Sequence, residues 1–126
     1  MNKDELLNLV KKLNFPKDEF YILSGGSLLI RGIREKTNDL DLCISEELFE
    51  QIKDKYNLTD DKKNEYGFYK LDDMVEIVVE PKSKFNIEEC EPFNLEDLNT
   101  ILAFKEKVNR PKDQIDIQKI KEYLNK

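Results

Sequence analysis

The chain has 126 residues, of which 39% are hydrophobic and 38% are charged, and its formal net charge is −6 at pH 7. It contains no histidine, which excludes Ser-His-Asp and Cys-His catalysis, and its two cysteines are too few for a structural zinc site. The acidic balance argues against binding to extended nucleic acid, and no apolar run is long enough to span a membrane. We therefore expect one compact cytoplasmic domain, residues 1–126, in which any metal is Mg²⁺ or Mn²⁺ held by carboxylates.

The first half of the chain predicts two helix–strand alternations. Apolar residues at helical spacing predict a helix over 3–14, and the aromatic run "FYILS" predicts a strand over 20–24. Gly25 and Gly26 then predict a turn, with Ser27 as the N-cap or first-turn residue of the short helix "LLIRGIRE". Strict alternation in "DLDLCIS" predicts a second strand over 39–45, and Ser45 is expected to cap the helix that follows.

The second half predicts a hairpin and two further helices. "YGFYKL" and "MVEIVVE" flank Asp72-Asp73 and predict antiparallel strands joined by a tight turn. A segment broken by Pro81 and Pro92 follows, and "NLEDLNTILAFKEKV" predicts a helix capped by Asn94. The last helix is expected to begin near Pro111. The predicted fold class is α/β (α+β), with helices packed on a small mixed sheet.

The strand over 39–45 separates two kinds of side chain. Successive residues of a strand point to opposite faces, so Leu40, Leu42 and Ile44 share one face, which must be packed. Asp39 and Asp41 share the other face with Cys43, about 7 Å apart along the strand. Two carboxylates at this distance can converge on a divalent cation, and without one they repel each other. The alternative is that both simply face solvent.

The predicted hairpin supplies a third acid. Val75, Ile77 and Val79 line one face of "MVEIVVE", and the other face carries Glu76 and Glu80. If this strand lies beside the strand over 39–45, only one of the two glutamates can be level with the aspartates, because they are about 13 Å apart. We favour Glu76, which is in mid-strand, and Glu80 remains the alternative.

The residues Gly25, Gly26 and Ser27 follow a strand and open a helix. Small residues let a ligand approach the backbone, and unpaired amides at a helix start suit a phosphate. A plain strand-to-helix turn explains the same residues. The order of the elements favours the functional interpretation: a phosphate site, a short helix, and then a carboxylate pair.

Several basic residues are candidates for contact with a phosphate. Lys105, Lys107, Arg110 and Lys112 form a basic run, and Arg31 and Arg34 lie on the short helix beside the proposed site. The alternatives are a solvated helix end for the first group and a surface role for the arginines. Asp113 or Asp116 is expected to form a structural pair with Arg110.

The combination of "SGGS", "DLDL" and "VEIVV" resembles the signature of the nucleotidyltransferase superfamily of the DNA polymerase β type. The resemblance covers Tyr21 to about Glu80, nearly half of the chain. Within that superfamily the chain resembles small bacterial members: minimal nucleotidyltransferases, antibiotic-modifying enzymes and the transferase toxins of abortive-infection systems. The segment "FKEKVNRPKDQIDIQKI" resembles the C-terminal part of some of them, in which a lysine helix precedes an R-x-K-D motif.

The resemblance implies a metal-dependent transfer of a nucleotidyl group from a nucleoside triphosphate to a hydroxyl acceptor. Gly25, Gly26 and Ser27 would then hold the triphosphate, assisted by Arg31, Lys105 and Lys112. Asp39 and Asp41 would bind Mg²⁺ or Mn²⁺, and Glu76 would take the place of the third acid. The acceptor is unidentified, and its site would be completed by the last helices or by the partner of a homodimer. A catalytically silent relative that binds a nucleotide or a partner, and a purely structural module, are the alternatives.

Overall fold

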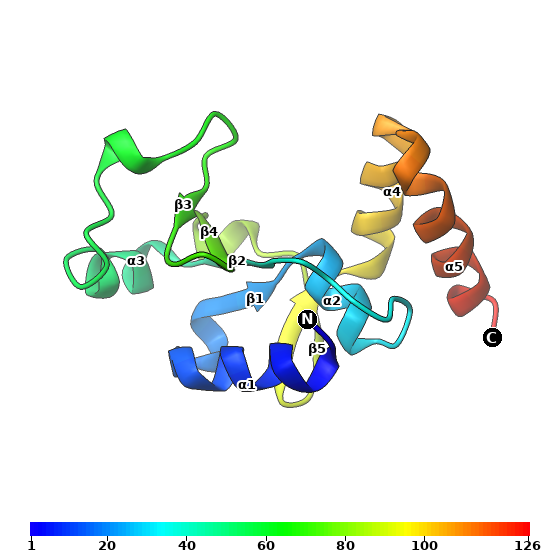
Figure 1. Ribbon diagram of the computed structural model, residues 1–126, viewed down its shortest axis with the longest axis horizontal. Coiled ribbons are helices and arrows are strands. Elements are labelled where there is room, and N and C mark those ends of the chain that lie inside the picture. Colours follow the sequence, from blue (N-terminus) through cyan, green and yellow to red (C-terminus); the bar gives the residue numbers. More distant parts are fainter.

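The structure is a computed structural model that describes residues 1–126, and it is built from one mixed sheet with helices around it (Figure 1). The helices are α1 (Lys3–Leu13), α2 (Ser24–Ile30), α3 (Glu46–Ile52), α4 (Leu98–Val108) and α5 (Gln114–Leu124). The strands are β1 (Phe20–Ile22), β2 (Leu40–Ile44), β3 (Tyr69–Lys70), β4 (Val75–Val79), β5 (Ile87–Cys90) and β6 (Phe93–Glu96). The predicted α+β class is confirmed. None of the helices has the length and apolarity needed to cross a membrane.

The six strands lie in the order β3-β4-β2-β1-β6-β5. The central strands β1 and β2 are antiparallel, and each has a parallel neighbour on its outer side, β6 beside β1 and β4 beside β2. Both edges are antiparallel hairpins, β3–β4 and β5–β6. The predicted hairpin is therefore confirmed, and its strand β4 lies beside β2, which is the condition under which Glu76 joins the aspartates.

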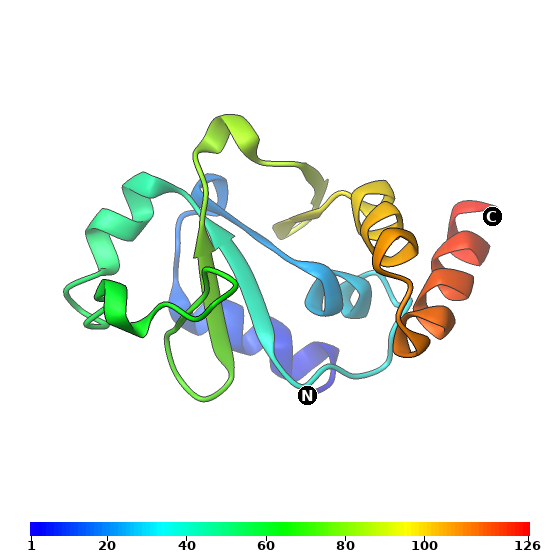
Figure 2. The same ribbon diagram turned by 90° about the horizontal axis from the view of Figure 1, so that it is seen from above.

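The main core lies on one face of the sheet. Leu40, Leu42 and Ile44 of β2 are fully buried there, as the alternation of the sequence predicts. They belong to one cluster with apolar residues of α1, α2 and α3. A second, smaller cluster joins α2 to the C-terminal helices α4 and α5, which lie together at one end of the sheet (Figure 2). The C-terminal helix pair is thus held mainly through α2.

Of the two helix caps predicted at Ser45 and Asn94, one is confirmed and one is wrong. Ser45 caps α3 as expected, because its side chain accepts a hydrogen bond from the N–H of Leu48. Asn94, however, lies within β6 opposite Glu89, and the cap of α4 is Asp97, whose carboxylate accepts from the N–H of Thr100. The prediction of Asn94 as a cap is wrong because it did not recognise β5 and β6, and their pairing extends the backbone through residue 96.

The predicted turn at Gly25-Gly26 is also wrong. Helix α2 begins at Ser24, with Leu23 in the N-cap position, so both glycines lie inside its first turn. The chain therefore passes from β1 into α2 with almost no loop. This brings Ser24 and Gly25 close to the middle of the sheet.

Candidate active site

The pairing of β2 with β4 brings the predicted acids together. The N–H of Leu40 donates to the carbonyl of Met74 over 2.8 Å, and this contact begins a parallel ladder in which Asp41 lies opposite Glu76. Residues opposite each other on neighbouring strands point to the same face. Asp41 and Glu76 therefore share the face away from the main core, and Asp39 lies on that face two residues earlier. Glu80 lies past the end of the ladder, where its N–H donates to Ile44.

The three acids interact through their charges. The pKa of Asp41 is raised to about 6, first because the carboxyl group is partly buried and then because Glu76 and Asp39 are negatively charged neighbours. Burial and like charge both disfavour ionisation, so a cation at this position would relieve an existing repulsion. The sequence predicted this repulsion from the spacing of Asp39 and Asp41 alone.

The donor chemistry of these acids fits a hard divalent cation. In this structure no group of three or more histidine, cysteine, aspartate or glutamate side chains is arranged to hold a metal ion. Mg²⁺ is commonly bound by one or two carboxylates together with phosphate oxygens of a substrate, rather than by a complete protein cage. Asp39 and Asp41 provide that smaller set of carboxylates.

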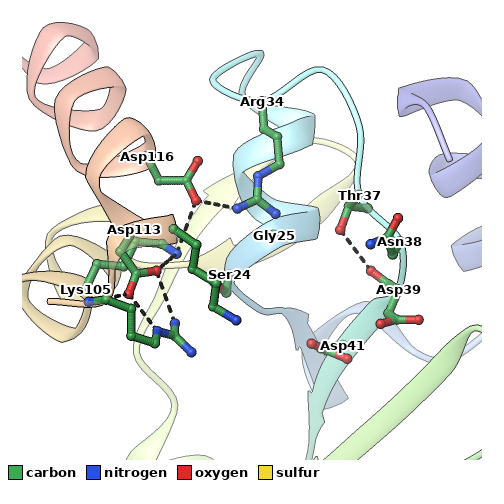
Figure 3. Close-up of a pocket in the computed structure, with 12 residues that line it drawn as sticks. Ser24, Gly25, Arg34, Thr37, Asn38, Asp39, Asp41, Lys105, Asp113 and Asp116 are labelled. Carbon is green, nitrogen blue, oxygen red and sulfur yellow. Dashed lines mark hydrogen bonds and ion pairs between the residues drawn. The ribbon is translucent and has the colours of Figure 1, made fainter. Parts of the chain in front are cut away.

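A polar hollow of about 400 Å³ opens beside the two aspartates (Figure 3). Its walls carry no hydrophobic side chain and are made by Ser24, Gly25, Arg34, Thr37, Asn38, Asp39, Asp41, Lys105, Arg110, Lys112, Asp113 and Asp116. Figure 3 shows Asp39 and Asp41 on one side, and Lys105 with Asp113 and Asp116 on the other. We call this space the polar hollow. It contains both carboxylates, which can bind a cation, and basic side chains, which can bind an anion.

Of the three residues predicted to hold the triphosphate, one lines the polar hollow and two lie in the packed interior. Gly25 lines the polar hollow, whereas Gly26 and Ser27 are buried away from it. The hydroxyl of Ser27 donates to the carbonyl of Ser24 over 2.6 Å. The N–H of Ser24 donates to Oε1 of Glu96 over 2.8 Å, so the first amide of α2 already has an anionic partner. Ser24 and Glu96 were missed by the sequence analysis.

The two arginines that were predicted on the short helix lie just past α2, which ends at Ile30, and they have different positions. The side chain of Arg31 is buried, and its Nη2 donates to the carbonyl of Glu96 over 2.7 Å and lies 3.4 Å from a carboxylate oxygen of Glu88. It does not line the polar hollow. Arg34 does, and it forms an ion pair with Asp116. The structure thus gives Arg31 a role in joining α2 to β5 and β6, and the surface alternative does not hold for it.

Lys105 is the centre of a buried charge network. Its Nζ lies 3.3 Å from a carboxylate oxygen of Asp113 and 3.3 Å from one of Asp116. Arg110 donates to both oxygens of Asp113, over 2.7 Å from Nε and 3.1 Å from Nη2. Arg110 is the main reason that the pKa of Asp113 is lowered to about 2, and Lys105 adds to it. The predicted pair of Asp113 with Arg110 is confirmed, and the alternative of a solvated helix end does not hold for Lys105.

Lys112 is the one cation of the polar hollow that forms no ion pair. Arg34, Lys105 and Arg110 are each bound to an aspartate, whereas Lys112 has no carboxylate partner. From the sequence, Lys105 and Lys112 were both expected to contact the triphosphate. Only their contacts in the fold distinguish a lysine that holds structure from one whose charge is free for a ligand.

Thr37 and Asn38 are further residues that the sequence analysis missed. Both line the polar hollow, and the hydroxyl of Thr37 donates to the carbonyl of Asp39 over 3.3 Å. They directly precede Asp39, so their closeness in the chain to the candidate acids was the available signal. The bond from Thr37 helps to fix the backbone of Asp39 where β2 begins.

Comparison with known proteins gives one structural likeness. No family model and no curated protein matches the chain. Among solved structures, the chain is similar to the crystal structure of ANT(2")-Ia in complex with adenylyl-2"-tobramycin, with a TM-score of 0.59. The sequence identity is 16%, over 94% of this chain and 85% of the other. The likeness shows that this chain has the fold of the nucleotidyltransferase ANT(2")-Ia.

Proposed function

We propose that the protein transfers a nucleotidyl group from a nucleoside triphosphate to a hydroxyl acceptor, with Mg²⁺ or Mn²⁺ held by Asp39 and Asp41. The observation that carries the proposal is the register of β2 with β4, which places Glu76 beside Asp41 on one open face of the sheet. The polar hollow beside these acids has the charges that a metal-bound triphosphate needs. The fold shared with ANT(2")-Ia supports the same reaction class.

The residues of the chain would act through position and charge. Asp39 and Asp41 would hold the ion, which when bound lowers the pKa of the acceptor hydroxyl and neutralises charge on the departing pyrophosphate. Glu76 lies on the β3 side of Asp41 and would accept the proton of that hydroxyl. Lys112 would pair with phosphate oxygens, while Ser24 and Gly25 bring backbone close to them. Fixed placement of these groups is the main catalytic contribution expected of the protein.

Lys112→Ala is expected to weaken binding of a nucleoside triphosphate roughly ten- to hundredfold, because one charge-assisted contact to phosphate is worth about 1.5–3 kcal/mol. Its unfolding free energy should stay within about 0.5 kcal/mol of the wild type, since Lys112 makes no ion pair. Calorimetric titration with Mg²⁺ and α,β-methylene-ATP measures the affinity. Lys107→Ala is the matched control, because Lys107 is exposed and lies outside the polar hollow. Equal weakening by both variants would show only a general effect of charge.

Alanine at the two glycines of α2 is expected to have different effects, mainly on stability at Gly26 and mainly on nucleotide binding at Gly25. A Cβ at Gly26 would lie 2.9 Å from Cγ2 of Ile22 and 3.2 Å from Cδ1 of Leu6, both in the packed core. Gly26→Ala should therefore lower the free energy of unfolding by about 1–2 kcal/mol. A Cβ at Gly25 would lie 2.8 Å from Nη1 of Arg34 and 2.9 Å from Oγ1 of Thr37, which line the hollow.

Gly25→Ala should therefore weaken nucleotide binding more than it lowers stability, because the tip of Arg34 can move. Urea unfolding and the same titration, applied to both variants, give the comparison. If Gly26→Ala weakened binding while the protein kept its stability, the assignment of Gly26 to packing would be wrong.

Transfer of radiolabel from an α-³²P nucleoside triphosphate tests the proposed function directly. Extracts or candidate hydroxyl compounds serve as acceptors, and pyrophosphate release is measured in parallel. We expect activity in the wild type, none in Asp39→Ala, Asp41→Ala or Glu76→Gln, and retained activity in Glu80→Gln. Activity that survives Asp41→Ala would refute the proposal. If Glu80→Gln lost activity and Glu76→Gln kept it, Glu80 and not Glu76 would be the third acid.

A further inference from the structure

A second hollow of about 190 Å³ adjoins the polar hollow and has a different chemical character. Four of its seven lining residues are hydrophobic, and the set is Leu23, Ser24, Asp41, Phe68, Glu96, Ile101 and Phe104. Ser24 and Asp41 line both hollows, so the two spaces meet at these residues. We call this space the aromatic hollow. A ligand that crosses the junction would be anionic at one end and apolar at the other.

We propose that the aromatic hollow binds the base of the nucleoside triphosphate, with the rings of Phe68 and Phe104 as its stacking surfaces and Glu96 as the acceptor for its amino group. This inference rests on the proposed function, since it takes the polar hollow as the place of the triphosphate. It adds the nature of the base, an amino-substituted ring system, and the three residues that bind it, of which Glu96 selects the amino group. A nucleotide is anionic at its phosphates and planar and apolar at its base, as the two joined hollows require.

The aromatic side of the hollow is exposed in the protein alone. Phe104 lies on α4 with 56% of its surface accessible, while Ile101, one turn earlier on α4, is buried. Phe68 directly precedes β3, and Figure 1 places β3 and α4 on either side of the central strands. Contact between a base and an aromatic side chain contributes about 1–3 kcal/mol and needs only a planar partner. An exposed phenylalanine at the edge of such a hollow is suited to that contact.

Glu96 is held in place by bonds that leave one carboxylate oxygen free. Its Oε1 accepts from the N–H of Ser24 over 2.8 Å, and its carbonyl accepts from Arg31 over 2.7 Å. Oε2 makes no hydrogen bond within the protein. A fixed acceptor in a largely apolar hollow favours a base that presents an amino group over one that presents a carbonyl at the same position.

The position of Glu76 favours the base over the acceptor as the occupant. Glu76 lines neither hollow, and it lies on β4, on one side of Asp41. Most of the aromatic hollow lies on the other side of Asp41, since Leu23 follows β1, and Glu96 and Phe104 belong to β6 and α4. Phe68, directly before β3, is the one lining residue from the side of Glu76. An acceptor whose hydroxyl gives its proton to Glu76 has to approach from the β3–β4 side. The aromatic hollow is then available for the base of the nucleotide.

Calorimetry with two probes tests the inference. Mg²⁺ with tripolyphosphate reports the polar hollow alone, and Mg²⁺ with α,β-methylene-ATP reports both hollows. Phe104→Ala is expected to weaken the nucleotide analogue roughly tenfold and to leave tripolyphosphate unchanged. Val108→Ala is the matched control, because Val108 lies one turn further along α4, is also exposed, and lines neither hollow. It should change neither affinity, and thermal unfolding should show that both variants are folded.

Glu96→Gln tests the choice of base. The amide oxygen of glutamine can still accept from Ser24, but the free acceptor is replaced by a donor. The wild type should bind the adenine analogue several-fold more tightly than the hypoxanthine analogue, which carries a carbonyl in place of the amino group. The variant should lose or reverse that preference.

The outcomes separate the two proposals. If tripolyphosphate binds and Phe104→Ala leaves the affinity of the nucleotide analogue unchanged, the aromatic hollow does not hold the base, whereas the proposed function stands. If Phe104→Ala instead raises only the KM for the acceptor, the hollow belongs to the acceptor and the inference is overturned. If neither probe binds to the wild type, the proposed function fails and this inference fails with it.

Discussion

Asp41→Asn is expected to lower nucleotidyl transfer roughly thousandfold and to raise the free energy of unfolding of the metal-free protein by about 2–3 kcal/mol at pH 7. The loss of activity follows because asparagine cannot supply the negative charge that holds the ion, and a bound ion contributes several kcal/mol to the transition state. The gain in stability follows because the carboxylate is partly buried beside Glu76 and Asp39. Asp41 would thus be needed for nucleotidyl transfer although it destabilises the metal-free protein.

The pH dependence of this effect has a definite sign. The pKa of Asp41 is about 6 in the folded protein, against an ordinary value of 3.8. A carboxyl group whose pKa is raised by folding binds its proton more tightly in the folded state, so its stabilising contribution is complete below pH 3.8 and is lost as the pH rises through 6. The difference in stability between Asp41→Asn and the wild type should therefore grow between pH 4 and pH 6 and then level off.

Urea unfolding with and without Mg²⁺ measures both parts of the prediction. Mg²⁺ should stabilise the wild type and leave Asp41→Asn unchanged, because binding to the folded state shifts unfolding by mass action. Glu80→Gln is the matched control, as Glu80 lies just past the end of β4 and is not among the acids that raise the pKa of Asp41. The account of Asp41 would be wrong if its asparagine variant were less stable than the wild type at pH 7 or still responded to Mg²⁺.

Asp113→Ala is expected to lower the free energy of unfolding by about 3–5 kcal/mol, the largest effect on stability that we predict. Asp113 is buried between Lys105 and Arg110 and accepts hydrogen bonds from both. Its removal leaves the buried Lys105 with Asp116 alone, and Asp116 is also paired with Arg34. Loss of one partner from a buried pair costs far more than loss of an exposed pair, because the remaining charge stays in the protein interior.

A surface pair on the same two helices provides the control for this prediction. Glu106 on α4 lies 3.3 Å from Lys121 on α5, and both side chains are about half exposed. Glu106→Ala should change the unfolding free energy by less than about 1 kcal/mol. The pKa of Asp113 is about 2, well below its unfolded value, so its contribution is complete above pH 4 and is lost as the pH falls towards 2. Similar losses in the two variants would contradict the central place given to Asp113.

The sequence predicted the acids better than the basic residues, for a physical reason. Alternation along a strand is local, so the face shared by Asp39 and Asp41 could be derived without knowing the fold. The place of Glu76 followed once β4 was assumed to lie beside β2. The structural role of Lys105, in contrast, depends on its ion pairs with Asp113 and Asp116. Asp116 is also bound to Arg34, which is 82 residues away in the chain. Nothing in the local pattern distinguishes such a lysine from a solvated one.

The segment before α4 was the least predictable part of the fold. Asn94 resembles a helix cap in the sequence, but the pairing of β5 with β6 extends it into a strand. As a result Glu96 reaches the start of α2, where it accepts from Ser24. Glu96 could therefore not be recognised as a site residue from the sequence alone. Gly26 and Ser27, which were expected to hold the triphosphate, are buried where α2 packs on the core.

The most direct test of the central claim is a crystal structure with Mg²⁺ and α,β-methylene-ATP bound. The account predicts an ion ligated by the carboxylates of Asp39 and Asp41, with the triphosphate in the polar hollow beside Lys112 and Glu76 free on the far side of Asp41. Density for the ion or the phosphates at any other place, or an ion that contacts neither aspartate, would contradict the account.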